Sequence, residues 1–322
     1  MRYLLIFLST ILLVSCQNVT EKKNLKLAHG LDPSHPVHKG MVFMAETLEK
    51  KSGGKLTMTI YPSGQLGSEQ QCVELLQIGS LAITKVSAAV LESFTNNFQV
   101  LGLPYIFRSK EHAFHVLDGE IGQELLLSTE KYKIRGLCFY DAGARSFYSI
   151  DQEIISPDNL KGMKIRVMKS QTSMNLVQAM GGSPTPISWG ELYTALQSGV
   201  VDGAENNPPS FYTSRHYEVC KQYSLNEHTR VPDVVIISTV VWNRLSDQEK
   251  IWLQEAANES VLVQRKYWEE SELMSIEEVK KAGVNVNYPD KGPFAAKVQG
   301  LLEEYQSSPE LYSLIQRIQA EE

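Results

Sequence analysis

Residues 181–206 have the sequence GGSPTPISWGELYTALQSGVVDGAEN, which contains the signals of a helix and of a strand after it. Ser188 and Glu191 have the spacing of a helix capping box, and Gly199 is placed to end the helix. The apolar face of this helix consists of Leu192, Ala195 and Leu196. Because a strand candidate, 160–167, and a second helix candidate precede it, the stretch predicts a βαβ-like unit.

The same alternation of strands and helices begins near the start of the chain. The other strand candidates are Leu25–His29, Leu56–Tyr61 and Leu81–Val86. Pro36 opens a helix between the first two, and Ser68 and Gln71 have capping-box spacing after the second. Repeated βα units favour an α/β fold with a largely parallel sheet.

The stretch Ser246–Ala282 contains few helix breakers and is longer than a typical helix. Two helices could meet there, or one long helix could run beside two lobes, and periodicity does not choose between them. The length of 322 residues is equally consistent with two lobes or one large domain.

The first residues predict export. The apolar run Leu4–Val14 follows Arg2 and is far shorter than the roughly 20 residues of a membrane-spanning helix, which is typical of a signal peptide. Residues 13–16, Leu-Val-Ser-Cys, resemble the lipobox of bacterial lipoproteins, although a buried N-terminal cysteine is the alternative. We therefore expect a lipoprotein signal peptide at residues 1–15, lipid attachment at Cys16, and a tether over residues 16–24.

Composition and spacing argue against several classes of protein. The formal net charge is −6, and no basic cluster in the sequence resembles a phosphate-binding footprint, so no nucleic-acid partner is expected. The remaining cysteines, Cys72, Cys138 and Cys220, lack CxxC spacing and are expected to be buried thiols. No metal or cofactor is expected, because no acidic third ligand accompanies the histidine pairs His35/His38 and His112/His115.

Residues 181–206 strongly resemble the signature of the DctP-type solute-binding subunits of TRAP transporters. Three further blocks resemble the family in the same order: Tyr61–Gly67, Leu103–Tyr105 and Leu160–Val167. The resemblance implies a two-lobed, periplasmic-binding-protein-like fold with a long helix spanning both lobes. It implies that lobe I contains residues 25–142 and 234–273, and that lobe II contains residues 143–233 and 274–322.

The resemblance also implies partners and a location. A binding protein of this family passes its solute to integral-membrane TRAP subunits that an ion gradient drives. The protein is therefore expected on the periplasmic or cell-surface side of a bacterial membrane, held there by its lipid anchor.

Arg166 is the first candidate ligand-binding residue, because the family's arginine in this K-x-R-V block pairs with the solute carboxylate. A guanidinium matches the two oxygens of a carboxylate, although most arginines are solvated surface residues. By the same resemblance Arg145 is expected to contact the anion or a hydroxyl. Asn206 matches the family's asparagine, with a turn role as the alternative, and the extra Asn207 is a departure from the family pattern.

Further candidates follow from matching positions. Glu69 is expected to accept hydrogen bonds from the solute, or to serve as a first-turn helix carboxylate. Lys85 and Ser87 are expected to face the cleft, and a buried lysine needs a partner that the solute would provide. Trp189 is expected to stack on a sugar ring or to be a core residue. Two weaker candidates, better explained as structural residues, are His29 and Asp233.

Several cationic and hydroxyl-binding groups favour a hydroxylated carboxylate as the solute, with a hexuronate such as glucuronate or galacturonate first. Dicarboxylates and sialic acid remain alternatives within the family. No catalytic motif is present, so the chain is not expected to be an enzyme. The alternatives are an exported enzyme acting on acidic sugars and a sensory ligand-binding subunit.

Overall fold

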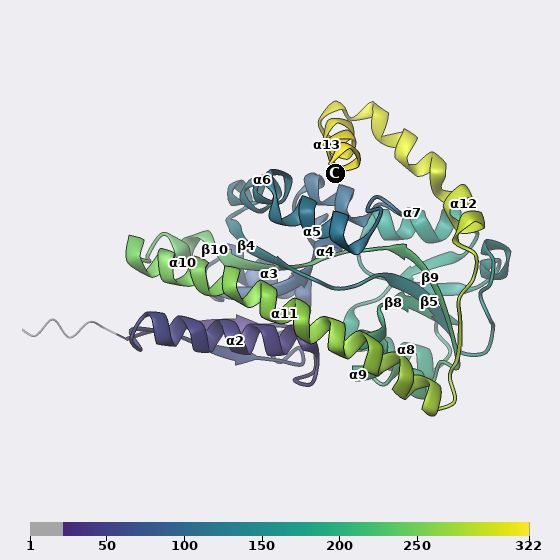
Figure 1. Ribbon diagram of the computed structural model, residues 1–322, viewed down its shortest axis with the longest axis horizontal. Helices are drawn as coiled ribbons and strands as arrows, with labels where there is room; N and C mark the ends of the chain where they lie inside the picture. The colour runs from purple at the N-terminus through teal and green to yellow at the C-terminus, as the bar shows by residue number, and fades with distance from the viewer. Residues whose placement is uncertain (1–21, 322) are drawn as a thin grey trace, which may run out of the picture.

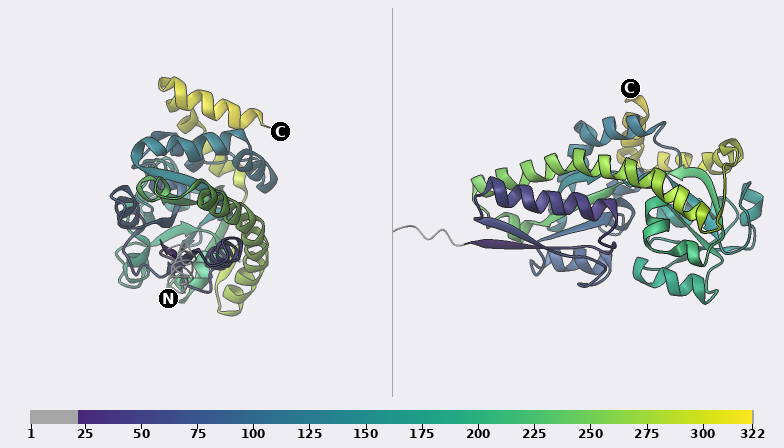
Figure 2. Two further views of the ribbon diagram at one scale, coloured as in Figure 1. Left: turned by 90° about the vertical axis from the view of Figure 1, so that its left-hand side faces the viewer. Right: turned by 60° about the horizontal axis from the view of Figure 1, so that its bottom comes forward.

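The computed structural model describes residues 22–321 of the chain. Two β-sheets, each with its own helices, form two lobes, which lie side by side in Figure 1 and in the right-hand view of Figure 2. The two-lobed α/β fold predicted from the sequence is therefore confirmed. The expected signal peptide, Cys16 and most of the tether lie outside the described residues.

The first lobe is built on a five-stranded sheet in the order β2-β1-β3-β10-β4. Its strands are β1 (Lys23–Ala28), β2 (Leu56–Tyr61), β3 (Ile83–Ser87), β4 (Ile134–Tyr140) and β10 (Asp233–Ser238). Side chains alternate between its two faces, as in any strand. Along β10, Val234 and Ile236 enter one apolar core, and Val235 and Ile237 enter the other. Both faces of the sheet are therefore buried.

The helices of the first lobe pack on these two faces. They are α2 (Pro36–Lys51), α3 (Glu69–Gln77), α4 (Ala88–Leu91), α5 (Lys110–Asp118), α6 (Glu120–Ser128) and α10 (Thr239–Trp242), with the 3₁₀ turns η2 (Asn96–Gly102) and η3 (Glu130–Tyr132). Local signals explain where they begin. Pro36 is the first residue of α2, and Ser68 and Gln71 form the predicted capping box of α3.

The second lobe is built on a six-stranded sheet in the order β11-β9-β5-β8-β6-β7. Its strands are β5 (Arg145–Ser149), β6 (Lys164–Val167), β7 (Ser183–Pro186), β8 (Gly203–Asn206), β9 (Gln222–Thr229) and β11 (Asn285–Asn287). Phe147 and Tyr148 of β5 enter different apolar cores, one on each face. The helices are α7 (Gln171–Ala179), α8 (Leu192–Gln197), α9 (Pro208–Thr213) and α12 (Lys291–Glu304), with η4 (Pro157–Leu160), η5 (Trp189–Glu191) and η6 (His216–Glu218).

The expectation of a largely parallel sheet is confirmed, although each sheet contains one antiparallel strand. In the first lobe β10 is antiparallel to both β3 and β4, and in the second lobe β5 is antiparallel to both β8 and β9. The physical reason is the path of the chain. Both β5 and β10 enter their sheet directly from the other lobe, so each starts at the cleft side, where the neighbouring parallel strands end.

A single helix, α11 (Asp247–Lys281), runs along both lobes (Figure 1). It contains 35 residues and begins at a capping box formed by Ser246 and Glu249. Of the two sequence interpretations, the long helix is therefore correct. In the first lobe α11 packs closely on α2, where a Cβ atom added to Gly40 would lie only 2.7 Å from Cβ of Gln264.

The capping box expected at Ser188 and Glu191 does not form. The backbone N–H of Glu191 donates to the carbonyl of Ser188 at 3.1 Å in the 3₁₀ turn η5, and α8 begins only at Leu192. The serine hydroxyl makes no capping hydrogen bond, because a backbone acceptor already satisfies that N–H.

The end of the chain departs from the expected division into lobes. Helix α12 packs on the second lobe through Phe294 and Val298. The 3₁₀ turn η7 (Tyr305–Ser307) follows, and α13 (Pro309–Ala320) then returns to the first lobe. Its apolar face joins the first-lobe core through Leu311, Leu314, Ile315 and Ile318. The remaining lobe boundaries stay a prediction.

Two further expectations concern cysteine and membrane helices. Cys72, Cys138 and Cys220 are buried free thiols, as predicted. Over residues 22–321, no helix has both the length and the apolar character that crossing a bilayer would require.

Candidate ligand-binding cleft

A cavity of about 620 Å³ lies between the two lobes. The first lobe contributes the loops after β1 and β2, the start of α3, and the cleft ends of β3 and β10. The second lobe contributes β5, β6 and β8, together with the segment after β7. Ligands of α/β proteins bind at the carboxyl ends of parallel strands, and the volume suits a small molecule.

Arg166 is buried in the cavity wall, with 2% of its surface exposed. Its Nε donates to the carbonyl oxygen of Ile187 at 2.8 Å, and its guanidinium lies 6.0 Å from the ring centre of Trp189. Among the described residues no carboxylate pairs with it, and its Nη1 has no hydrogen-bond partner. Burial lowers the pKa of Arg166, because the charged guanidinium loses its hydration and gains no paired carboxylate within the described residues.

Arg145 is also buried in the wall, but it is already paired. Its Nε and Nη2 donate to the two carboxylate oxygens of Glu205 at 2.5 and 2.9 Å, and its Nη1 donates to Oδ1 of Asn206 at 2.7 Å. Burial would lower the pKa of Arg145, but the Glu205 carboxylate more than offsets this and raises it. Arg145 and Glu205 together add no net charge to the cleft.

Lys85 is buried on the first-lobe side of the cavity and bridges two carboxylates. Its Nζ lies 2.9 Å from Oε1 of Glu69 and 3.1 Å from Oδ1 of Asp233. Although burial opposes the charge, the two carboxylates raise the pKa of Lys85. The expectation that the solute must supply the partner of Lys85 is therefore corrected, because the protein supplies two. This acid–lysine cluster, Glu69, Lys85 and Asp233, carries one net negative charge.

The asparagine pair has divided roles. Asn206 accepts three hydrogen bonds at Oδ1, from Arg145 and from the backbone and side-chain N–H groups of Asn207. Its oxygen is thus used within the protein, and its amide nitrogen is the group left for a ligand. Asn207 is the N-cap of α9, where its Oδ1 accepts from the N–H of Ser210 at 2.8 Å. The extra asparagine is therefore a capping residue that also lines the cavity.

Trp189 and Ser87 line the cavity from opposite lobes. The indole ring is half-buried and packs against residues of both lobes, and a Cβ atom added to Gly30 would lie 3.5 Å from its Cδ1. The backbone N–H of Ser87 donates to Oε2 of Glu69 at 3.3 Å, which fixes the second oxygen of that carboxylate. Trp189 thus forms an aromatic wall where the lobes meet.

His29 is not among the residues that line the cavity. Its Nδ1 accepts from the N–H of Leu31 at 3.1 Å, and its Nε2 lies 3.0 Å from Nδ1 of His38. Burial, together with the nearby charge of Lys85, lowers the pKa of His29 to about 3, so its ring is neutral. The structure brings together the other nine candidates in one cavity wall: Glu69, Lys85, Ser87, Arg145, Arg166, Trp189, Asn206, Asn207 and Asp233.

Glu205, which pairs with Arg145 in the cavity wall, is the residue that the sequence interpretation missed. It is 2% exposed on the buried strand β8, where an acidic side chain needs a cationic partner, so its position did carry a signal. Burial would raise its pKa, but Arg145 and His228 lower it to about 2. Lining residues with no ionisable group, such as Met168 and Ser210, gave no signal of this kind.

Two α/β lobes around a ligand-sized cavity, with a buried guanidinium that no carboxylate of residues 22–321 pairs, are the features of a solute-binding protein. The chain belongs to the bacterial extracellular solute-binding proteins of family 7, the DctP family, whose model matches residues 27–308. This confirms the family predicted from the sequence, and with it an extracytoplasmic role in TRAP transport.

Solved structures and curated relatives agree with this assignment. A TRAP periplasmic solute-binding protein from Bradyrhizobium in complex with galacturonate is 38% identical, with a TM-score of 0.90 over 92% of this chain and 99% of that one. One from Anaerococcus prevotii with bound glucuronate is 37% identical, with a TM-score of 0.90 over 92% and 97%. The sialic acid-binding periplasmic protein SiaP of Vibrio cholerae is 31% identical over 94% of each chain.

Proposed function

We propose that this protein captures a hexuronate, glucuronate or galacturonate, by closing its lobes around it, and delivers it to TRAP membrane subunits. The observation that carries the proposal is Arg166, a buried guanidinium without a carboxylate partner in the described chain. A solute carboxylate would complete its hydrogen bonds and balance its charge. The amide nitrogen of Asn206 and the paired Arg145 would contact the same end of the solute.

The opposite wall favours a hydroxylated solute over a dicarboxylate. The acid–lysine cluster carries one net negative charge, so a second carboxylate placed there would be repelled, whereas hydroxyl groups could donate to Glu69 and Asp233. A molecule with one carboxylate at one end and several hydroxyls at the other matches both walls. Two of the structurally similar proteins hold such molecules, galacturonate and glucuronate.

Calorimetry of the purified protein tests the ligand. We expect micromolar or tighter binding of glucuronate or galacturonate, and at least tenfold weaker binding of succinate, malate and sialic acid. No uronate binding below millimolar concentration would overturn the ligand assignment, and preferential succinate binding would contradict the role given to the acid–lysine cluster.

We infer that the bound solute leaves chemically unchanged, so that the protein is a carrier and not an enzyme on acidic sugars. The membership in a solute-binding family supports this inference. Incubation of protein with a uronate, followed by product analysis, should return the uronate intact. A changed product would favour the enzyme, whereas capture of a receptor in place of transporter subunits would favour a sensory role.

We also propose that the mature protein starts at Cys16 and carries a lipid there. The support is the lipobox-like Leu13–Cys16 directly after an apolar segment. Mass spectrometry of protein from bacterial membranes should find the N-terminal peptide starting at an acylated Cys16. A peptide that retains residues before Cys16, or an unmodified cysteine, would contradict the proposal.

A further inference from the structure

The end of the first lobe opposite the cleft gathers residues from many elements. The parallel strands β1, β2 and β3 begin at this end, because their other ends meet the cavity. Strand β4 also begins here, β10 and α2 end here, and α11 starts beside them. In Figure 1 this is the left-hand end of the first lobe, where α10 lies.

Basic residues occupy most of these element ends. The contacts place them together: the N–H of Lys23 donates to the carbonyl of Lys55 at 2.9 Å, Nζ of Lys23 lies 3.4 Å from the carbonyl of Arg244, and the N–H of Thr239 donates to Lys133. The residues are Lys22, Lys23, Lys50, Lys51, Lys55, Lys131, Lys133, Arg135, Arg244 and Lys250.

The charge at this end is opposite in sign to that of the whole chain, which is −6. Most acidic residues here are used in ion pairs: Glu130 with Arg135, Glu249 with Lys23, Glu255 and Glu259 with Lys51, and Asp247 with Lys250. Six exposed basic residues form no ion pair within residues 22–321, and we call them the basic end: Lys22, Lys50, Lys55, Lys131, Lys133 and Arg244. Two exposed acids near this end of α2, Glu46 and Glu49, also form no ion pair within residues 22–321.

Exposed apolar side chains lie among these charges. Ile78 is 70% exposed at the end of α3, beside Gln77, whose amide donates to the carbonyl of Tyr132 at 3.0 Å. Leu127 is 44% exposed at the end of α6, and Ile251 is 50% exposed in the first turns of α11. Surfaces that combine lysines with exposed apolar side chains are typical of proteins that rest on a membrane interface.

We propose that the basic end, with Ile78, Leu127 and Ile251, rests on the anionic headgroups of a lipid bilayer. The charges are spread over the ends of several elements, and none of these residues lines the cleft cavity, which fits a diffuse negative surface better than a discrete ligand. The described residues also begin at this end, with Lys22, so an anchor at Cys16 would hold this end within roughly 20 Å of the bilayer, at about 3.4 Å per extended residue. This last argument rests on the lipid attachment proposed above, whereas the charge pattern does not.

The proposed contact would set the orientation of the protein on the membrane. The cleft lies at the other end of the first-lobe strands, and the second lobe lies beyond it (Figure 2, right). With the basic end on the bilayer during solute capture, the second lobe would point away from the lipid and remain able to move as the cleft closes, and delivery to the membrane subunits would require this contact to be released.

Vesicle flotation tests the surface directly. The probe is the chain from Gln17 onward, which lacks the lipid but retains every described residue, mixed with phosphatidylcholine vesicles with or without 30% phosphatidylglycerol. The test variant is Lys50→Glu/Lys55→Glu/Arg244→Glu. Its matched control is Lys161→Glu/Lys266→Glu/Lys297→Glu, which makes the same charge change at exposed positions outside the basic end.

We expect at least tenfold tighter binding to the anionic vesicles, a loss of at least tenfold in the test variant, and a change within twofold in the control. Each basic residue near an anionic bilayer is worth roughly fivefold in affinity. Equal binding to both vesicles, or equal losses in both variants, would overturn the proposal. Binding only to membranes that retain their proteins would also overturn it and assign the surface to an acidic protein partner. The uronate affinity of both variants, measured by calorimetry, should equal that of the wild type. A failure of the membrane proposal can then be told from a failure of the proposed function.

Discussion

At the scale of single residues, Arg166 determines what the cleft can hold. Replacing it with alanine removes the one buried cation in the described wall that lacks a carboxylate partner. We expect Arg166→Ala to weaken uronate affinity more than tenfold, because a hydrogen bond to a charged group contributes roughly 1.5–3 kcal/mol. Isothermal calorimetry measures the loss, and an unchanged thermal melt would show that the fold persists.

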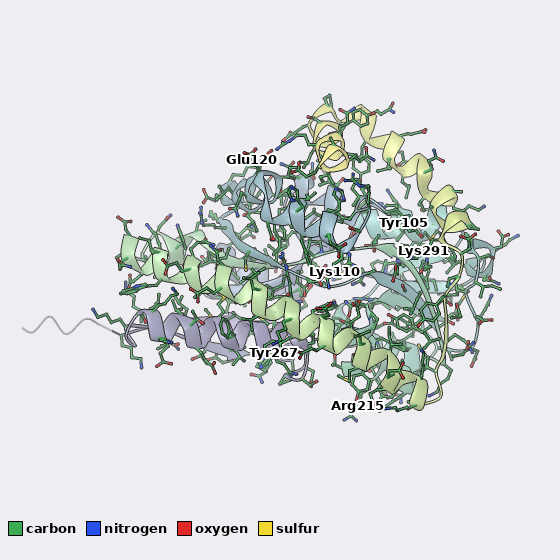
Figure 3. All side chains as sticks on the ribbon, viewed as in Figure 1. Tyr105, Lys110, Glu120, Arg215, Tyr267 and Lys291 are labelled. Carbon is green, nitrogen blue, oxygen red and sulfur yellow. The ribbon has the colours of Figure 1, made fainter. Side chains whose placement is uncertain are left out.

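Two further variants make this result specific. Arg166→Lys keeps the charge but loses the planar pair of donors, so its affinity should fall between those of the wild type and Arg166→Ala. Arg215→Ala removes an arginine whose side chain is 73% exposed and which lies at the surface in Figure 3. That control should bind as the wild type does. Wild-type affinity in Arg166→Ala would contradict the proposed pocket.

Glu69 should control selectivity. Glu69→Gln removes one of the two carboxylates on Lys85, which leaves the acid–lysine cluster neutral. We expect weaker uronate binding, because a strong acceptor is lost, and a smaller penalty for a second carboxylate. The ratio of uronate to succinate affinity should therefore fall at least tenfold in calorimetry. An unchanged ratio would mean that the cluster does not face the solute.

The sequence identified the ionisable groups of the cleft better than their partners. Arg145, Arg166 and Lys85 were found because they lie in family-like blocks or inside an apolar strand. Their pairing was not visible, because Glu205 is 60 residues from Arg145, and Asp233 is 148 residues from Lys85. Contacts between strands that are distant in the sequence decide which cation the protein neutralises. They also decide which cation remains for a ligand.

At the scale of elements, the contact between α2 and α11 holds the long helix on the first lobe. Gly40→Ala would place a Cβ atom 2.7 Å from Cβ of Gln264, whose side chain also hydrogen-bonds the backbone of Asp141 in the segment between the lobes. We expect the clash to lower the free energy of unfolding by about 1–3 kcal/mol, which exceeds the higher helix propensity of alanine. Urea denaturation measures it.

Gly300→Ala is the matched control for this contact. Gly300 lies on α12, and an added Cβ atom would meet nothing within 4 Å. The same substitution should therefore raise the free energy of unfolding by roughly 0.5–1 kcal/mol through helix propensity. Equal effects at Gly40 and Gly300 would show that the close packing of α2 against α11 has no energetic consequence.

The sequence predicted the boundaries of helices correctly where local hydrogen bonds or a proline determine them. The capping box at Ser68 and the proline at the start of α2 are local, and both were found. The same pattern at Ser188 failed, since a 3₁₀ turn precedes α8 and uses the backbone carbonyl instead. The single helix α11 could not be told from two helices, because its continuity depends on packing against both lobes.

At the scale of the whole molecule, the sequence could not predict two features: the antiparallel direction of β10 and the return of α13 to the first lobe. The pattern of β10 is that of any buried strand, and its antiparallel direction arises because the chain arrives from the other lobe. Likewise the apolar face of α13 predicts burial, but not against which lobe. Both features depend on the spatial path of distant segments, which periodicity does not contain.

Glu92 connects the two lobes beside the cavity. It follows α4 of the first lobe and is 7% exposed. Its Oε1 accepts from the hydroxyl of Ser170 at 2.9 Å, and its Oε2 accepts from the N–H of Thr172 at 3.2 Å, at the start of α7. Burial raises the pKa of Glu92 to about 7, although these hydrogen bonds oppose the shift. Tyr105, labelled in Figure 3, makes a further contact between the lobes through its N–H, which donates to His228.

The raised pKa predicts how stability depends on pH. Unfolding exposes Glu92, whose carboxyl then returns to its ordinary value of 4.5, so the folded protein holds a proton between pH 4.5 and about 7 that the unfolded chain releases. This stabilising contribution is complete below about pH 4.5 and is lost as the pH rises through about 7. It amounts to on the order of 3 kcal/mol.

Glu92→Gln, a neutral side chain of nearly the same shape, should remove this pH dependence. Urea denaturation at pH 5 and pH 8 should show that the wild type loses about 2–3 kcal/mol of unfolding free energy relative to the variant as the pH rises. Glu310→Gln, which removes an exposed carboxyl on α13, should keep a constant difference from the wild type across the same range. Parallel stability curves for the wild type and Glu92→Gln would mean that Glu92 is solvated in the folded protein and that this contact does not hold the lobes together.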